Sequence, residues 1–139
     1  MTAAGRVLRA SYAVAGAAAE LDRTLPLAPD EQVLLQGAVR VRDGGLLALP
    51  AVLRLTSARL AVLAHRAIGA DRVWDLPRGS VQDVRSDGAR LLITWQDAQG
   101  ETSELRLGPW TGQRATARPL RDLAPVGAEL HQWLGPSAP

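Results

Sequence analysis

The sequence predicts an α+β domain: a β-barrel or β-sandwich of about seven antiparallel strands, with one helix before it and a capping helix after it. Three observations predict this fold class. After residue 30, short runs rich in valine and leucine alternate with turn residues at the spacing typical of sandwiches and barrels. Residues 2–23 are rich in alanine and lack proline, which favours a helix. Leu120, Leu123, Gly127, Leu130 and Leu134 follow one another at intervals of three and four residues, as on one face of a helix.

The N-terminal segment carries a possible apolar stripe. Val7, Val14 and Leu21 repeat every seven residues. Such a stripe can pack against the same chain or against a helix of another subunit, or the segment can be a mobile tail, and the pattern leaves these three interpretations open. "TLPLAPDE" ends the helix because its two prolines cannot continue one. We therefore predict an N-terminal helical extension over residues 1–28 and a β-rich domain over residues 29–135.

Each predicted strand has its own pattern. "QVLLQGAVRVR" alternates valine with arginine near its end, which indicates one buried and one wet face, and Asp43-Gly44-Gly45 then marks a hairpin turn. "LLAL" follows, and Pro50 limits it to a sheet edge or a bulge. "AVLRLT" and "RLAVLAH" predict a hairpin around Thr56-Ser57-Ala58-Arg59. The later strands are "RVWDLP", "SVQDVRS", "ARLLITW" and "ETSELRL", with turns at Asp87-Gly88 and "QDAQG".

Arg59 stands just past the turn of the hairpin in "VLRLTSARLAVL". Alternation puts Leu60 and Val62 on one face of the strand and Arg59 on the other, beside the turn. There its guanidinium can donate hydrogen bonds to free carbonyl groups of a bend that Thr56 and Ser57 already tighten. We expect Arg59 to brace the fold rather than to bind a ligand.

The C-terminal segment predicts an amphipathic helix. Pro125 falls off the apolar face and kinks or restarts the helix, and Gly135-Pro136 ends it. The apolar face consists of Leu120, Leu123, Gly127, Leu130 and Leu134.

The order of these segments resembles a known family. "LRLTSARLAVL" is similar to the LT-x-x-RL hairpin of GRAM domains, a branch of the PH-like superfamily, and "EQVLLQGAVRV" leads into it. "WDLPRGSVQDV", the final hairpin "LLITWQDAQGETSELRL" and the closing helix follow in the family's order. The resemblance covers residues 30–134 and implies a PH-like barrel or sandwich whose C-terminal helix plugs an open end. Arginine without lysine, together with abundant alanine, leucine and glycine, indicates a bacterial origin.

The chain departs from the PH-like proteins that grip inositol phosphates. Those proteins resemble one another in a basic residue on the first strand and a basic–x–Arg pair on the second. Arg42 and Arg54 fill two of these positions, but Thr56 stands at the third and carries no charge. The resemblance therefore does not imply phosphoinositide binding.

Composition excludes several kinds of function. The formal charge is only +2 and acidic residues alternate with arginines, so we predict no nucleic-acid partner. With no cysteine, the chain has no disulfide and no thiolate site. His65 and His131 lie in different segments without metal-ligand spacing, and no nucleophile or phosphate-loop motif is present. We expect no catalytic activity, metal or cofactor.

Two kinds of residue are candidates for binding. Arginines between residues 40 and 78 can gather near one rim, where their planar forks suit carboxylates and anionic headgroups; otherwise they are solvated strand residues paired with aspartates. Leu46 and Leu47 form an apolar patch if they project from the hairpin, and Leu47 faces the core if the strand continues. Trp110, in a Gly/Pro/Thr loop, is the tryptophan expected to touch a partner. The predicted ligand- or partner-binding residues are Arg40, Arg42, Arg54, Arg66, Arg72, Leu46, Leu47 and Trp110.

These observations lead to a functional expectation. We predict a non-catalytic, cytoplasmic binding or scaffold module that contacts another protein, or a second copy of itself, through a barrel rim or a free sheet edge. The alternative is a peripheral adaptor on the inner membrane face, which would bind anionic lipid through the rim arginines and the leucines after Gly45.

Overall fold

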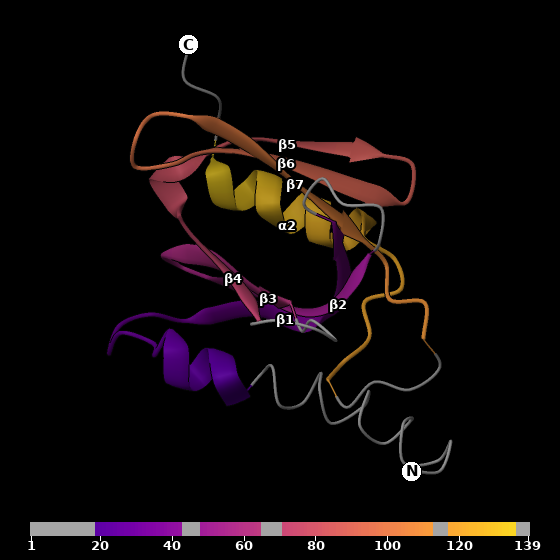
Figure 1. The fold of residues 1–139 in the computed structure, drawn as a ribbon, viewed down its shortest axis with the longest axis horizontal. Helices are drawn as coiled ribbons and strands as arrows, with labels where there is room; N and C mark the ends of the chain where they lie inside the picture. Colours follow the sequence, from indigo (N-terminus) through magenta and orange to yellow (C-terminus); the bar gives the residue numbers. More distant parts are fainter. Residues whose placement is uncertain (1–18, 43–47, 65–70, 113–116, 136–139) are drawn as a thin grey trace.

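The computed structural model describes residues 19–42, 48–64, 71–112 and 117–135. It confirms the predicted fold class: seven antiparallel strands form one sheet in the order β4-β3-β2-β1-β7-β6-β5, with a helix at the C-terminal end and helical residues 19–24 before the sheet. Figure 1 shows the β1–β4 half and the β5–β7 half on either side of helix α2. The elements are β1 (Val33–Arg42), β2 (Leu49–Thr56), β3 (Arg59–Ala64), β4 (Arg72–Pro77), the 3₁₀ turn η1 (Arg78–Ser80), β5 (Val81–Asp87), β6 (Arg90–Gln96), β7 (Thr102–Gly108) and α2 (Ala124–Leu134).

The main core lies between the two halves of the sheet. Val39 and Val41 point into it from β1, as the alternation predicts, and neither is exposed to solvent. Leu130 and Trp133 of α2 fill it from the open side of the sandwich. Burial of such apolar surface contributes about 25 cal/mol per Å² and supplies most of the drive to fold.

The hairpin of β2 and β3 forms as predicted. Ser57 and Ala58 connect the strands, and Leu55 pairs with Leu60 next to this turn. Side chains are buried on both faces of the hairpin, from residues 51 to 56 and from 60 to 64. Two-sided burial explains why these strands read as continuous apolar runs rather than as an alternation.

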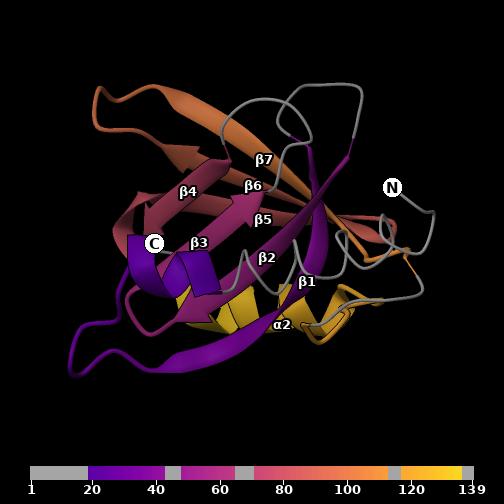
Figure 2. The ribbon, with the colours of Figure 1, turned by 60° about the horizontal axis from the view of Figure 1, so that its bottom comes forward.

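A second apolar cluster covers the outer face of β1–β4, away from α2. The short helix of residues 19–24 lies on this face (Figures 1 and 2). Leu21 is fully buried there, so the described part of the extension packs against its own chain, while Val7 and Val14 lie outside the described residues. This outer-face cluster consists of Leu21, Ala38, Val52, Ala61, Leu63 and Trp110, with Leu25, Val73 and Ala117 partly buried against it.

Pro50 does not lie at a sheet edge, contrary to expectation. It is the second residue of β2, which runs between β1 and β3, and it pairs with Arg40 of β1. Among the described residues, the β2–β3 register ends at the Ala51–Ala64 pair. Within them, the missing N–H of Pro50 therefore removes no β2–β3 hydrogen bond, as is tolerated where a strand begins.

The C-terminal helix is shorter than the leucine spacing predicts. It begins at Ala124, and Pro125 occupies its first turn, where the missing N–H would have had no partner in any case. Leu120 and Leu123 are buried, but they precede the helix. Leu120 belongs instead to a short segment, residues 118–120, that runs parallel alongside β1.

Gly37 allows residues 118–120 to lie so close to β1. Pro119 bridges to Ala38 in parallel, the Ala38 N–H donates to the Arg118 carbonyl over 2.7 Å, and the Leu120 N–H donates to the Ala38 carbonyl over 3.0 Å. A Cβ atom at Gly37 would lie 2.5 Å from Leu120 Cγ and 2.7 Å from the Arg118 carbonyl oxygen. Only a residue without a Cβ permits so close an approach.

Candidate functional site

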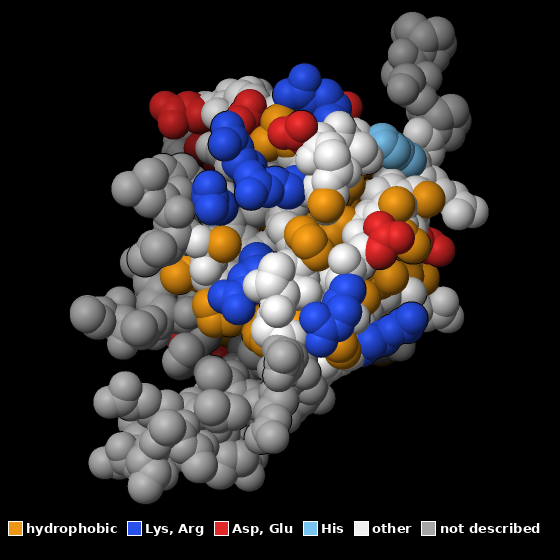
Figure 3. Space-filling model, turned by 90° about the vertical axis from the view of Figure 1, so that its right-hand side faces the viewer, with side chains coloured by type: hydrophobic (Ala, Val, Ile, Leu, Met, Phe, Trp, Pro, Cys, Tyr) orange, Lys and Arg blue, Asp and Glu red, His pale blue; other side chains and the backbone are white. Residues whose placement is uncertain are grey.

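A cavity of about 320 Å³ opens where β1 meets β7. Four arginines line it: Arg40 and Arg42 from β1, Arg90 from the start of β6 and Arg106 from β7. No carboxylate is among the described residues that line it. We call it the arginine cavity, and Figure 3 shows arginine side chains gathered on this side of the molecule. Its remaining described lining is Val41, Ala48, Ala89, Leu107, Gly108, Pro109 and Thr111.

Strand register brings these arginines together. The end of β1 pairs with the end of β7, so that Arg42 lies directly opposite Arg106. The next pair along the ladder, Val41 and Leu107, is fully buried. Because side chains alternate along a strand, the arginines beside this pair point outward. Leu91 of β6 pairs with Leu107 in turn, and this places Arg90 at the same end of β7. Glu104 lies 4.0 Å from Arg106, but both side chains are half exposed or more, and such a pair is weak. Like charges directly opposite each other in a sheet are destabilising, so the opposed arginines still favour a bound anion.

Trp110 is buried against the sheet instead of presenting its ring to solvent. It is only 6% exposed and belongs to the outer-face cluster, because its backbone N–H donates to the Leu120 carbonyl and folds the loop back onto the sheet. The guanidinium carbon of Arg40 lies 4.9 Å from the centre of the Trp110 ring, within cation–π range. Arg40 Nε is buried without a hydrogen-bond partner.

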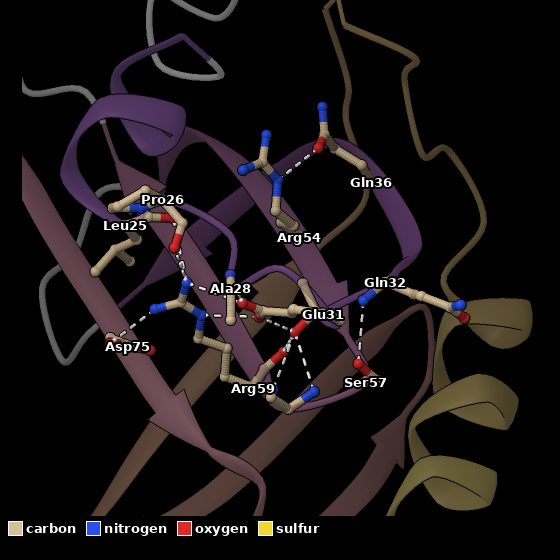
Figure 4. A network of polar contacts seen from close by, with 12 residues as sticks. Leu25, Pro26, Ala28, Glu31, Gln32, Gln36, Arg54, Ser57, Arg59 and Asp75 are labelled. Atoms are coloured by element: carbon tan, nitrogen blue, oxygen red, sulfur yellow. Dashed lines mark hydrogen bonds and ion pairs between the residues drawn. The ribbon is translucent and has the colours of Figure 1, made fainter.

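Arg54 lies far from any rim. Its side chain is 6% exposed, and Nη2 is 2.6 Å from a carboxylate oxygen of Asp22. Nε donates to the Gln36 side-chain oxygen over 2.7 Å (Figure 4). Arg54 therefore holds the short N-terminal helix on the outer face of the sheet, a contact that the strand pattern alone could not show.

Arg59 is a brace, as predicted, but it braces a more distant segment than the turn. Its Nη2 donates to the carbonyls of Pro26 and Leu25 over 2.8 and 3.2 Å, and its Nε lies 3.0 Å from a Glu31 carboxylate oxygen (Figure 4). A longer contact of 3.4 Å joins Nη1 to Asp75. We call Arg59 with these partners the linker clamp, because it fixes the chain between the N-terminal helix and β1.

Glu31 is the buried anion of the linker clamp, with a side chain only 3% exposed. Burial alone would raise the pKa of this carboxyl group. Hydrogen bonds from the Thr56 hydroxyl, the Ala28 N–H and the Arg59 guanidinium, together with the charge of Arg59, outweigh burial and lower the pKa below its usual value. Burial likewise acts to lower the pKa of Arg59, but Glu31 and Asp75 raise it overall. The clamp is therefore ionised at neutral pH.

The structure brings together only part of the predicted site. Arg40 and Arg42 share the arginine cavity, whereas Arg72 is exposed on β4 with its guanidinium 4.8 Å from the Trp74 ring centre. Arg66, Leu46, Leu47 and His65 lie outside the described residues. Arg90 and Arg106 were not predicted. Their signal is weak, an arginine before or between core leucines in "ARLL" and "ELRL".

Metal binding and membrane spanning find no support in the described ranges. No cluster of three or more histidine, cysteine, aspartate or glutamate side chains there could hold a metal ion. No helix in the same ranges has the length and apolarity needed to cross a membrane.

No protein-family model matches the chain, and no curated protein matches its sequence. Among solved structures, the chain is similar to the hSac2 domain of the human phosphoinositide phosphatase Sac2. The TM-score is 0.55 at 12% identity, over 84% of this chain and 79% of that one. At this identity the likeness shows the fold alone: the chain has a PH-like sandwich fold.

Proposed function

We propose that the chain is a non-catalytic binding module that takes an anionic lipid headgroup in the arginine cavity. The observation that carries this proposal is the direct opposition of Arg42 and Arg106, with two further arginines around the same cavity. Guanidinium forks donate paired hydrogen bonds to phosphate and carboxylate oxygens. An anion held by these guanidinium groups would offset the repulsion between Arg42 and Arg106.

Two further observations support a lipid as the source of the anion. The segment between Arg42 and Ala48 begins and ends at the cavity, and its sequence includes Leu46 and Leu47. In sequence, these leucines follow a strand that carries cavity arginines, and leucine next to basic residues is the combination by which peripheral proteins bind anionic membranes. The structurally similar hSac2 domain belongs to a phosphoinositide phosphatase. On this proposal the protein is a peripheral adaptor on the inner membrane face.

Replacing Arg90 and Arg106 together by glutamine is expected to abolish sedimentation with vesicles that contain anionic lipid. Wild-type binding should weaken steeply as salt is raised, because screening acts on the cavity charges. A matched control replaces Arg23 and Arg85, whose side chains are 67% and 64% exposed outside the cavity, and removes the same net charge. Equal losses in both variants would mean that overall charge, and not the cavity, drives binding. Inorganic phosphate as competitor distinguishes a free anion from a lipid headgroup.

Arg106→Gln alone is expected to change the stability of the free protein by less than about 0.5 kcal/mol, because it removes the repulsion from Arg42 together with a long, exposed ion pair to Glu104 at 4.0 Å. The same variant should gain less thermal stability than wild type when phosphate is added. Thermal unfolding with and without phosphate measures both effects. An equal gain with phosphate in the variant and in wild type would show that Arg106 does not hold the anion, against the proposal.

A second candidate function is protein binding at a sheet edge. Strands β4 and β5 form the two outer edges of the sheet. A cavity of about 360 Å³ lies beside β4, lined by residues of β4, of η1, of β6 and of the β6–β7 turn. An extended segment of a partner could add to either edge. Failure to bind anionic vesicles, together with slowed amide hydrogen exchange confined to β4 or β5 in the presence of a captured protein, would favour this candidate.

A further inference from the structure

Strand β4 has a free edge, with which no strand of the described ranges pairs. Its other edge pairs with β3 without irregularity over its whole length. Hydrogen bonds of an antiparallel ladder alternate between residue pairs, and just beyond this ladder the Arg78 N–H donates to the Ala58 carbonyl over 3.0 Å. Counting back along β4 from that bond, the backbone N–H and carbonyl groups of Val73 and Asp75 point toward the free edge.

The opposite edge of the sheet, β5, is protected against the addition of a strand. Its pairing with β6 has an irregularity between Val81 and Asp83, and charged residues recur at every second position from Asp83 to Asp87. Bulges and charged side chains are devices by which natural sheets prevent an edge from pairing. Because β4 is regular up to Pro77, the residues before that proline form the edge that is open to another strand.

The cavity of about 360 Å³ beside β4, which we call the edge cavity, lies next to this open edge. Asp75 and Pro77 of β4 line it on one side, and Trp95 at the end of β6 and Asp97 in the β6–β7 turn line it on the other. Nε1 of Trp95 is buried although the residue is partly exposed, so any exposed part of the indole ring is carbon. The described lining has two carboxylates and no arginine or histidine, which suits a cation.

Both carboxylates of the edge cavity have oxygens left for a further donor. Asp97 accepts two backbone N–H groups of its own turn through the same oxygen, Oδ1, each over 2.9 Å, and these bonds leave Oδ2 for another partner. Asp75 is 38% exposed, and its contact with Arg59 is long, 3.4 Å (Figure 4). Arg59 also has a shorter contact, of 3.0 Å, with the buried Glu31. The edge cavity therefore retains negative charge.

We propose that an extended segment of a partner protein adds to β4 as a further strand and places an arginine or lysine side chain in the edge cavity. Backbone pairing with Val73 and Asp75 supplies affinity, and the cavity supplies the preference for a basic residue. The Trp95 ring offers a face to the cation, and the two carboxylates offer charge-assisted hydrogen bonds. This inference rests on the second candidate function, binding at a sheet edge, and names the edge and the chemistry of the partner.

Blocked peptides of alternating valine and threonine, with one central arginine, test the proposal on the ¹⁵N-labelled full chain. We expect the arginine peptide to shift the amide resonances of β4 and the indole resonance of Trp95. A peptide with glutamate in place of the arginine should bind about tenfold more weakly or worse, because both carboxylates repel it. The arginine peptide N-methylated throughout cannot pair with a strand and should lose binding.

Asp75→Asn combined with Asp97→Asn tests whether the edge cavity causes this preference. Asparagine keeps the side-chain oxygen that closes the β6–β7 turn, so the variant retains those hydrogen bonds. The arginine and glutamate peptides should bind this variant with affinities within about twofold of each other. The matched control, Asp83→Asn with Asp87→Asn, removes the same charge from β5 and should keep the full preference.

The outcomes separate this inference from the candidate function on which it rests. Equal binding of the arginine and glutamate peptides to wild type, or shifts on β5 instead of β4, overturns the inference and leaves edge binding standing. A preference that the β4 and β5 variants lose equally overturns it as well, because net charge and not the edge cavity would then be the cause. No shift with either peptide at millimolar concentration overturns the inference and edge binding together.

Discussion

Arg59→Ala is expected to lower the free energy of unfolding by about 3 kcal/mol, and to leave anionic vesicle binding unchanged. The substitution leaves Glu31 buried without its cation and leaves the Leu25 and Pro26 carbonyls without their donor. An uncompensated buried charge is far more costly than a lost surface pair. The contact with Asp75, which is 38% exposed, adds little. Denaturant unfolding at pH 7 measures the loss.

The pH dependence of this loss identifies its cause. Folding lowers the pKa of Glu31, so the carboxylate adds stability above its unfolded pKa and loses that contribution as the pH falls through the folded pKa. The difference in free energy of unfolding between wild type and Arg59→Ala should therefore be constant from pH 6 to pH 8, on the order of 3 kcal/mol, and should become smaller in acid. Arg85→Ala, at a well exposed arginine, serves as a control with little effect. Full stability of Arg59→Ala with loss of binding would make Arg59 a ligand contact.

Gly37→Ala is expected to destabilise the fold by about 2–3 kcal/mol, because the added methyl group has no space. It would meet the Arg118 carbonyl oxygen and the Leu120 side chain well inside contact distance. To remove this clash, residues 118–120 must move away from β1. The movement breaks their hydrogen bonds with Ala38 and takes Leu120 out of the core. Thermal or denaturant unfolding measures the loss of stability of Gly37→Ala against wild type.

Gly79→Ala is the matched control for Gly37→Ala. A Cβ atom there would meet nothing within 4 Å, and the backbone does not need the left-handed region. Its stability should stay within about 0.5 kcal/mol of wild type, as at most surface sites. Equal unfolding midpoints for wild type, Gly37→Ala and Gly79→Ala would show that residues 118–120 are loosely held against β1.

Local pattern predicted the strands well. Valine–arginine alternation in β1 and the Thr-Ser-Ala-Arg turn before β3 are decided by near neighbours, so a single sequence reveals them. The start of α2 was missed for the opposite reason. Leu120 keeps helical spacing by coincidence, while its backbone is held against Ala38, which lies far away in the sequence. The spacing of apolar residues cannot reveal a contact between segments that are far apart in the sequence.

The candidate site was only half predictable. Arg40 and Arg42 are two residues apart on β1, so the sequence alone places them on the same face of the strand. Arg90 and Arg106 join them only through the β1–β7 and β6–β7 registers, and these depend on how the sheet closes. Arg54 looked like a binding residue because its strand position is that of a PH-like basic site. Asp22, placed opposite it by the docking of the N-terminal helix, gives it another partner.

The outer-face cluster also bears on the order of folding. Leu21 is the first residue of this cluster to leave the ribosome, yet its neighbours in the cluster include Leu63 and Trp110. Contacts so distant in sequence form only after long loops have closed. The short helix of residues 19–24 is therefore synthesised first and docks late, and a nascent chain must carry Leu21 unburied until the β2–β3 hairpin and the loop after β7 have been synthesised.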